Sequence, residues 1–284
     1  MRVGAHVSAA GGFDGLVDRA GALGVQAAQF FLSSPRTWKY RPLAASASGP
    51  VTQAARLRGV ERLVVHASYL INLGSNDPQL VTKSSELLAA VMATSVEESL
   101  AAVVLHPGSH KGSGFSESLE RWRQAVAPTV SIASETTQLL LENTAGGGAS
   151  MGRSVAELRQ LVERCERPNV VGICIDTQHL FAAGYDLRDR VLADELADEL
   201  KSVFGKVAVV HLNDSASELG SAHDRHANLG EGEIGLDALI DFVHHEVFQS
   251  ADLILEVPGA GDGPRMEDVV QLRDALANSG VSDS

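Results

Sequence analysis

The first informative stretch is VGICIDTQH, residues 171–179, an apolar run that ends in the carboxylate of Asp176. A near-continuous apolar run is typical of a parallel strand that is buried on both faces. In an α/β barrel, a polar residue directly after such a strand lies at the carboxyl rim, where the catalytic groups gather. The stretch therefore predicts a buried parallel strand that carries Asp176 at the functional end of the fold.

The same pattern occurs eight times along the chain. Short aliphatic runs end in or just before a polar residue, and segments of helical period lie between them. These runs cover residues 3–6, 25–31, 63–66, 103–106, 139–142, 171–176, 207–211 and 253–256. Eight strands alternating with helices within about 250 residues predict a (β/α)₈ TIM barrel. A doubly wound open sheet is the alternative, but it usually has fewer strands.

The segments between the strands have the pattern of amphipathic helices. In residues 188–204, Leu192, Leu196, Leu200 and Val203 recur at three- and four-residue steps, which predicts one buried stripe. Residues 78–100 show a similar pattern. The low-complexity stretch 43–50 and the tail 278–284 are expected to be a loop and a frayed end. No linker divides the chain, so we expect one domain over residues 1–284.

Composition limits the cellular setting and the partners. No stretch approaches the roughly 18 apolar residues that cross a bilayer, so no membrane contact is expected. With only two cysteines, Cys165 and Cys174, the sequence predicts a cytoplasmic protein without disulfides. The net charge of -13 argues against a nucleic-acid partner. Bound divalent cations would reverse the local charge of an acidic pocket, so this objection is weak for a metalloenzyme.

Six polar residues come at the ends of the predicted strands. They are His66, His106, Glu142, Asp176, His211 and Glu256. Burying so many imidazoles and carboxylates at one rim is costly unless they bind metal or each other, so the pattern predicts a metal cluster.

Two short motifs add His179, Asp224 and His226, which gives five histidines and four carboxylates. This donor set suits Zn²⁺, with Mn²⁺ or iron as substitutes, and is too rich in imidazole for Mg²⁺ or Ca²⁺. His6 ends the first predicted strand and is either structural or orients a ligand. The glycine-rich run 230–235 resembles a phosphate cradle, but Glu231 and Glu233 would repel phosphate, so we interpret it as turns.

At these positions the chain resembles the endonuclease IV family of apurinic/apyrimidinic (AP) endonucleases. Eight motifs match in order, over almost the whole chain: GAHVSAAGG at 4–12, HASYLINLG at 66–74, LHPGSH at 105–110, ENTAG at 142–146, DTQHLFAAGYD at 176–186, HLNDS at 211–215, DRHANLGEGEIG at 224–235 and LEVPG at 255–259. The resemblance implies a xylose-isomerase-like barrel that repairs DNA, without an obligate protein partner and as a monomer.

The resemblance also implies the ligand sets and the reaction. Three zinc ions per chain would be held by His66, His106 and Glu142, by Glu142, Asp176, His211 and Glu256, and by His179, Asp224 and His226. Glu142, shared by the first two sets, is the implied catalytic residue. The implied reaction is hydrolysis of the phosphodiester 5′ to an abasic site in double-stranded DNA, which leaves a 3′-hydroxyl and a 5′-deoxyribose phosphate. Removal of 3′-blocking groups is implied as well.

DNA contacts follow from the same resemblance. Arg36, Tyr69 and Leu70 lie in the loops after the second and third predicted strands and would penetrate the duplex at the lesion. Ordinary loop packing is the alternative for Tyr69 and Leu70. Three positions depart from the family pattern, namely Gln178 for cysteine, Gly147 for glutamine and Val257 for threonine.

Two other functions are compatible with parts of the pattern. A metal-dependent sugar isomerase or epimerase on the same barrel also places histidines and carboxylates at strand ends, but generally uses one or two metals. A protein that binds metal or damaged DNA without catalysis could also keep the fold. In such a protein, the loss of catalysis would be expected to show first as substitutions of the metal ligands. Retention of all nine candidate ligands favours the endonuclease.

Overall fold

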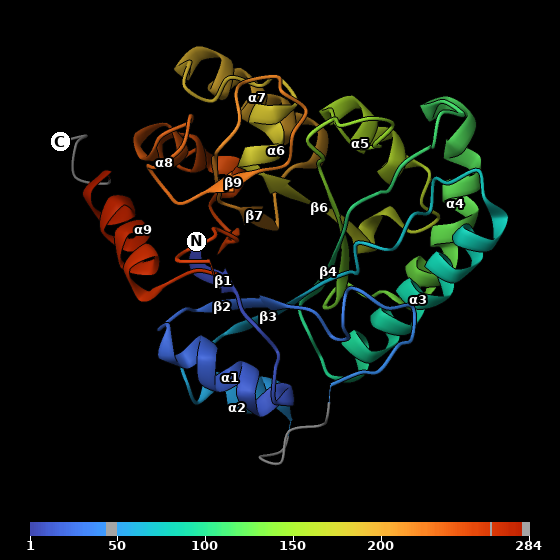
Figure 1. Cartoon of the computed structure of the whole chain (residues 1–284), viewed down its shortest axis with the longest axis horizontal. Coiled ribbons are helices and arrows are strands. Elements are labelled where there is room, and N and C mark those ends of the chain that lie inside the picture. The colour runs from blue at the N-terminus through green and yellow to red at the C-terminus, as the bar shows by residue number, and fades with distance from the viewer. Residues whose placement is uncertain (44–49, 262, 280–284) are drawn as a thin grey trace.

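The computed structural model describes residues 1–43, 50–261 and 263–279, and its central feature is a closed parallel barrel (Figure 1). The strands are hydrogen-bonded in the order β1-β10-β7-β6-β5-β4-β3-β2. They are β1 (Arg2–His6), β2 (Ala27–Phe30), β3 (Arg62–His66), β4 (Ala102–Leu105), β5 (Gln138–Glu142), β6 (Val171–Asp176), β7 (Val209–His211) and β10 (Asp252–Leu255). The predicted TIM barrel is therefore confirmed.

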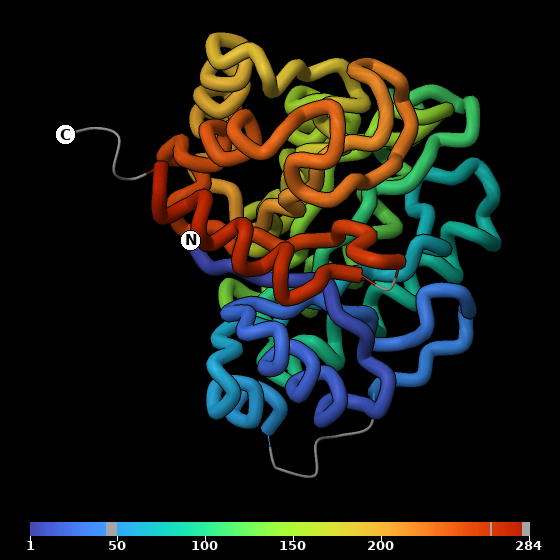
Figure 2. The backbone as a smooth tube through the Cα atoms, turned by 60° about the vertical axis from the view of Figure 1, so that its left-hand side comes forward, coloured from blue at the N-terminus to red at the C-terminus, as the bar shows by residue number. Residues whose placement is uncertain are grey.

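Helices surround the barrel in chain order (Figure 1). They are α1 (Gly12–Ala22), α2 (Val51–Arg56), α3 (Pro78–Glu97), α4 (Phe115–Ile132), α5 (Val155–Glu163), α6 (Thr177–Ala182), α7 (Arg190–Phe204), α8 (Leu236–Val243) and α9 (Met266–Ser279), with short 3₁₀ turns at Pro168–Val170 and Glu246–Phe248. The tube in Figure 2 shows α9 lying against the first strand, so the two ends of the chain close the ring. No helix in the described part of the chain is long and apolar enough to span a membrane.

The predicted strand limits differ from the observed ones by one or two residues. β2 and β7 begin two residues later than predicted, because residues 25–26 and 207–208 belong to the turns that lead into these strands. His106 and Glu256 follow β4 and β10 directly instead of ending them. Most of the stretch 43–50 and of the tail 278–284 lies outside the described residues, so those two predictions stay untested.

One helix prediction needs correction. The buried stripe of α7 consists of Ala193, Leu196, Ala197 and Leu200, whereas Leu192 is 50% exposed. Two of the four buried residues are alanines, so a pattern that counts only large aliphatic residues selects the wrong side of the first turn.

Small and branched apolar side chains fill the inside of the barrel. Ala27, Val64, Val104, Leu140, Cys174, Val209 and Ile254 form this inner cluster with Ala102. The packing is tight enough that a Cβ on Gly4 of β1 would lie 2.5 Å from Cδ1 of Ile254. Because the interior is filled, the polar residues at the strand ends lie on a closed apolar floor.

Candidate metal centre

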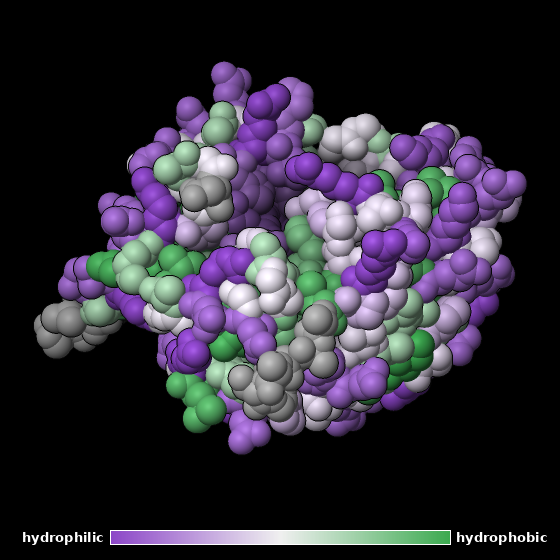
Figure 3. Space-filling view, turned by 60° about the horizontal axis from the view of Figure 1, so that its bottom comes forward, coloured by the Kyte–Doolittle hydropathy of each residue, from purple (hydrophilic) through white to green (hydrophobic). Residues whose placement is uncertain are grey.

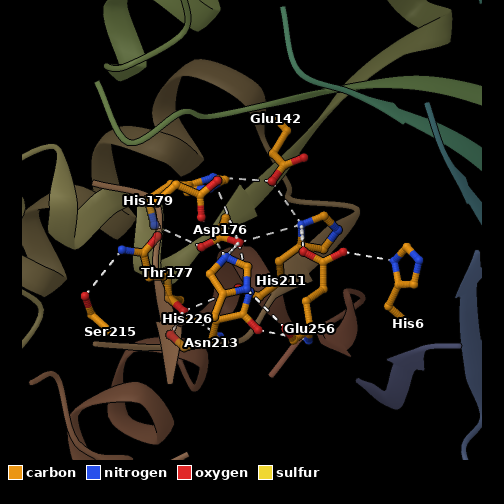
Figure 4. Close-up of polar contacts among 12 residues, drawn as sticks. His6, Glu142, Asp176, Thr177, His179, His211, Asn213, Ser215, His226 and Glu256 are labelled. Carbon is orange, nitrogen blue, oxygen red and sulfur yellow. Dashed lines mark hydrogen bonds and ion pairs between the residues drawn. The ribbon is translucent and has the colours of Figure 1, made fainter. Parts of the chain in front are cut away.

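The barrel brings all six predicted strand-end residues to one rim. Figure 4 shows Glu142, Asp176, His211 and Glu256 pointing toward one another from separate strands, with His179 and His226 beside them. Glu142, Asp176 and His211 are the last residues of β5, β6 and β7. Parallel strands end at the same level, so residues far apart in the sequence meet there.

Glu142 lies at the middle of this cluster and is fully buried. Its Oε2 atom is 3.1 Å from Nε2 of His66 and 2.9 Å from Nε2 of His106. Its Oε1 atom is 3.0 Å from Nδ1 of His211 and 3.4 Å from Nδ1 of His179. One carboxylate thus faces four imidazoles, two on each oxygen.

Asp176 and Glu256 continue the cluster toward β7. Nδ1 of His211 lies 3.2 Å from Oε2 of Glu256 and 3.8 Å from Oδ2 of Asp176. Asp176 is also the N-cap of α6, since its Oδ1 accepts a hydrogen bond from the backbone N–H of His179 at 2.9 Å. The cap fixes the rotamer of Asp176 and leaves Oδ2 facing the cluster.

A third group forms around His179 and His226. Oδ2 of Asp224 lies 3.2 Å from Nε2 of His179, and Oδ1 lies 3.3 Å from Nε2 of His226. His226 belongs to the short strand β9 (His226–Ala227), which pairs with β8 (Asp214–Ser215). Asp176 also reaches His226, with Oδ2 3.5 Å from Nε2. The third group therefore contains Asp176 in addition to the three residues expected from the sequence.

The pKa values of the carboxylates and the imidazoles in this cluster depend on each other. Burial by itself would raise the pKa of Glu142, but the imidazoles of His106 and His211 outweigh it and hold that pKa well below its ordinary value. Burial would lower the pKa of His226, yet Asp176 and Asp224 raise it to about 9. Against the effect of burial, Asp176 and Asp224 raise the pKa of His179, and Cys174 and Glu256 raise that of His211. The cluster thus attracts positive charge, either as protons on imidazoles or as cations.

The positions of the ligand-type atoms fit divalent cations. Three sets of nitrogen and oxygen atoms each lie within 4.8 Å of one another: His66, His106 and Glu142; Glu142, Asp176, His211 and Glu256; and Asp176, His179 and His226. Nε2 of His226 is buried, and although carboxylate oxygens of Asp224 and Asp176 lie 3.3 and 3.5 Å away, none of the described residues accepts a well-directed hydrogen bond from it. A buried nitrogen without a hydrogen bond is costly, and a bound cation would satisfy it. Imidazole and carboxylate together are the donor types that zinc prefers.

Sequence reasoning missed Gln29, a buried residue of the centre at the third position of β2. Its Oε1 lies 2.9 Å from Nε2 of His211, and its Nε2 donates to Oε1 of Glu256 at 2.6 Å. Nε2 of Gln29 also lies 3.0 Å from Nδ1 of His6, which in turn is 3.1 Å from Oε1 of Glu256. Gln29 and His6 therefore orient the ligand-type groups. The signal was available, because Gln29 is the single polar residue within the apolar run AAQFF.

Asn213 has a similar orienting position. Its Nδ2 donates to Oδ2 of Asp176 at 2.8 Å, and its Oδ1 accepts from the backbone N–H of Glu256 at 2.9 Å. It therefore connects the carboxylate of Asp176 to the backbone of Glu256.

The glycine-rich run 230–235 does bind an anionic group, but that group is the side chain of Asp214. The backbone N–H groups of Gly230, Gly232, Ile234 and Gly235 donate to the buried carboxylate of Asp214, at 2.9 to 3.3 Å. The expected turns are present. They surround the carboxylate of Asp214 in β8 and so help to hold β8 and β9 near the cluster.

A cavity of about 550 Å³ opens beside the cluster and is lined by His106, His179 and Asp224. Tyr69 and Leu70 line the same cavity, as does Trp38. The ring of Tyr69, which is 63% exposed, lies 5.6 Å from that of His66. Arg36 is exposed in the loop after β2 but is not among the described residues that line the cavity. Figure 3 shows that one face of the molecule is hollowed and that hydrophilic side chains surround the hollow.

The departures from the family pattern have different structural settings. Gln178 is buried in α6, and its Nε2 donates to the carbonyl oxygen of His223 at 2.9 Å. It therefore anchors the loop that carries Asp224 and His226. Gly147 lines the cavity, and a Cβ there would lie 2.9 Å from the carbonyl oxygen of Ala222. Val257 is buried in the core.

Comparison with known proteins gives a consistent result. A family model described as a xylose isomerase-like TIM barrel matches residues 17–278. A protein of Halothermothrix orenii named probable endonuclease 4 is 37% identical over 260 residues, which cover 91% of this chain and 94% of the relative.

Solved structures have the same fold. The crystal structure of endonuclease IV from Thermus thermophilus superposes with a TM-score of 0.82 at 36% identity, covering 98% of this chain and all of that chain. A D-tagatose 3-epimerase-like protein superposes with a TM-score of 0.72 at 20% identity, covering 98% and 96%. The second similarity shows the barrel fold alone.

Proposed function

Because the chain belongs to the endonuclease IV family, we propose that it is a DNA-repair nuclease that cuts the backbone at AP sites. The observation that supports this proposal is the convergence of nine histidines and carboxylates in three connected groups beside an open cavity. Its substrate would be double-stranded DNA, cut 5′ to the abasic sugar to leave a 3′-hydroxyl and a 5′-deoxyribose phosphate. The same centre would remove 3′-blocking groups.

We assign the nine residues to three zinc ions, as the donor chemistry favours. His66, His106 and Glu142 would hold the first, Glu142, Asp176, His211 and Glu256 the second, and His179, Asp224 and His226 the third. Bound zinc supplies Lewis acidity, which polarises a phosphoryl oxygen and makes water nucleophilic at neutral pH. Nine ligands, one of them shared, are enough for three metal ions. Sugar isomerases on this barrel typically use one or two.

The protein's own residues would orient this chemistry. Asn213 and the cap of α6 fix Asp176, while Gln29 and His6 fix Glu256. The apolar floor of the barrel excludes bulk water from below. The electrostatic attraction of the ligand carboxylates for cationic groups therefore stays strong. The centre is therefore held rigid before substrate arrives.

The cavity suggests how the lesion would be recognised. An abasic nucleotide has no base to unstack, so it leaves the helix at a lower cost than a paired one. Tyr69 and Leu70, which line the cavity, would fill the gap in the duplex, and Arg36 would contact the backbone nearby. We further propose that residues 1–284 act as a single domain and as a monomer.

Nicking of a defined duplex tests the proposal. A labelled oligonucleotide duplex with one tetrahydrofuran abasic analogue should be cut once, 5′ to the analogue, by zinc-loaded protein. Chelation should abolish the cut and added zinc should restore it. An undamaged duplex of the same sequence is the control. Metal-replete protein that leaves the abasic duplex intact while it epimerises a ketose would overturn the proposal.

A further inference from the structure

The first turns of α7 carry an apolar surface that is distinct from the metal centre. Leu192 is 50% exposed and Val191 is 66% exposed, although α7 has a buried face that includes Leu196 and Leu200. α7 lies on the outside of the ring of helices (Figure 1). Adjacent large aliphatic residues at a helix start are unusual on a surface that water alone contacts.

Leu192 borders a small cavity between α7 and the loop that precedes it. The cavity has a volume of about 280 Å³, and its apolar walls include Tyr185, Leu187 and Leu196. Cavities that bind whole small molecules usually measure about 300–1,000 Å³, so this one suits a single inserted side chain. None of its lining residues also lines the cavity at the metal centre.

Two unpaired carboxylates lie over this cavity. Glu195 and Glu199 both line it and are one helical turn apart, and both are exposed. Within the described parts of the chain, neither makes an ion pair or a hydrogen bond. Like charges four residues apart destabilise a helix, and a cation from outside would relieve this repulsion.

Neighbouring acidic residues behave differently. Asp186 pairs with Arg188 at 2.8 Å, Asp198 with His245 at 3.1 Å, and Glu246 with Lys201. Of these three acidic residues, Asp186 lines the cavity and is paired, whereas Glu195 and Glu199 have no partner among the described residues. The surrounding half of the chain is also acidic, since residues 151–284 contain 25 Asp and Glu but only 11 Lys and Arg.

We propose that this surface, formed by Tyr185, Leu187, Leu192, Leu196, Glu195 and Glu199, docks a basic segment of another protein. An aliphatic side chain of that segment inserts into the cavity, and a Lys or Arg about one turn away pairs with Glu195 and Glu199. The two carboxylates repel nucleic acid and anionic lipid, so charge complementarity selects a basic polypeptide. The proposal does not depend on the nuclease activity.

Binding of a defined peptide tests this surface. The probe is a fluorescein-labelled 12-residue peptide of alternating Leu and Lys pairs, and a 12-residue oligolysine measures attraction by charge alone. The Glu195→Gln/Glu199→Gln double variant should raise the Kd for the Leu/Lys peptide roughly tenfold, and Leu192→Ser should raise it severalfold. The matched control is Asp237→Asn/Asp241→Asn, which removes an acidic pair of the same spacing from α8 and should change Kd less than twofold.

Three results would overturn the proposal. Equal weakening by the two double variants would mean diffuse attraction to an acidic protein. Oligolysine that binds as tightly as the Leu/Lys peptide would mean that no side chain enters the cavity. Concentration-dependent self-association that Leu192→Ser abolishes would mean that a second copy of this chain covers the surface. Thermal unfolding of each variant near the wild-type midpoint would show that all of them are folded.

Discussion

The two ends of the barrel both hold buried carboxylates, but they neutralise them with different partners. At the amino end, Asp252 of β10 lies 2.7 Å from Nη1 of Arg2 and 3.1 Å from Nε of Arg62. Arg2 also pairs with Glu61 at 3.0 Å. At the carboxyl end, the ion-pair partners of Glu142 among the described residues are the imidazoles of four histidines.

The difference separates a structural network from a binding site. Arginine keeps its proton at any ordinary pH, so the pairs at the amino end are permanent. An imidazole can exchange a proton for a metal ion, and the carboxyl end also keeps a buried nitrogen of His226 without a hydrogen bond to any described residue. A buried charge cluster indicates function when its partners can be exchanged, and stability when they cannot.

The largest expected effect is at the carboxyl end. Glu142→Gln keeps the shape of the side chain but removes the charge that two ligand sets share. Nicking of abasic duplex should fall on the order of a thousandfold, equivalent to about 4 kcal/mol of transition-state stabilisation. Single-turnover rates at saturating enzyme measure this effect, and binding to the abasic duplex should remain. A rate near that of the wild type would mean that Glu142 is wrongly assigned.

Gln29→Leu should have a smaller effect, because Gln29 orients His211 and Glu256 without being a ligand itself. Loss of such an orienting hydrogen bond typically costs about 10–100-fold in metal affinity. Competition with a chromogenic chelator measures that affinity. Gln26→Leu is the matched control, since Gln26 is an amide just before the amino end of the same strand. If both variants lose metal equally, the effect belongs to the strand and not to the centre.

The rim loops are expected to contribute about tenfold to lesion recognition. Tyr69→Ala and Leu70→Ala should weaken binding to abasic duplex by roughly 1–2 kcal/mol, because they would replace the stacking lost at the lesion. Arg36→Ala should do the same and also reduce the salt dependence of binding. Dissociation constants for abasic and undamaged duplex at fixed salt measure the effect. Equal weakening on both duplexes would assign these residues to general backbone affinity.

The smallest expected effect is at the amino end. Asp252→Asn removes a buried charge, but Arg2 and Arg62 are about one third exposed and can regain water. The free energy of unfolding should fall by about 1–2 kcal/mol, as denaturant titration would show, while the nicking rate stays within about twofold. A large loss of activity would mean that the two ends are coupled, and the contrast between them would no longer hold.

The sequence predicted the barrel because each strand carries its own signal. An apolar run that ends near a polar residue needs no information from elsewhere in the chain, so all eight strands were found. The signal is weaker at strand limits and on helix surfaces. Leu192 was assigned to the buried stripe of α7, whereas Ala193 and Ala197 are the residues that are buried there. A prediction that counts only large aliphatic side chains does not detect buried small residues such as these alanines.

At the site, the sequence by itself determined which residue types end the strands. Six of the nine candidate ligands follow from these positions, and two short motifs supply His179, Asp224 and His226. Only the tertiary structure decided which of them meet. Asp176 reaches His226 through the β8–β9 hairpin, Gln29 supports His211 from the other side of the barrel, and the glycine-rich run wraps Asp214 instead of a phosphate. These contacts join residues that are 16 to 182 positions apart. Their distances are set by closure of the barrel, which is a property of all eight strands together and of no single segment.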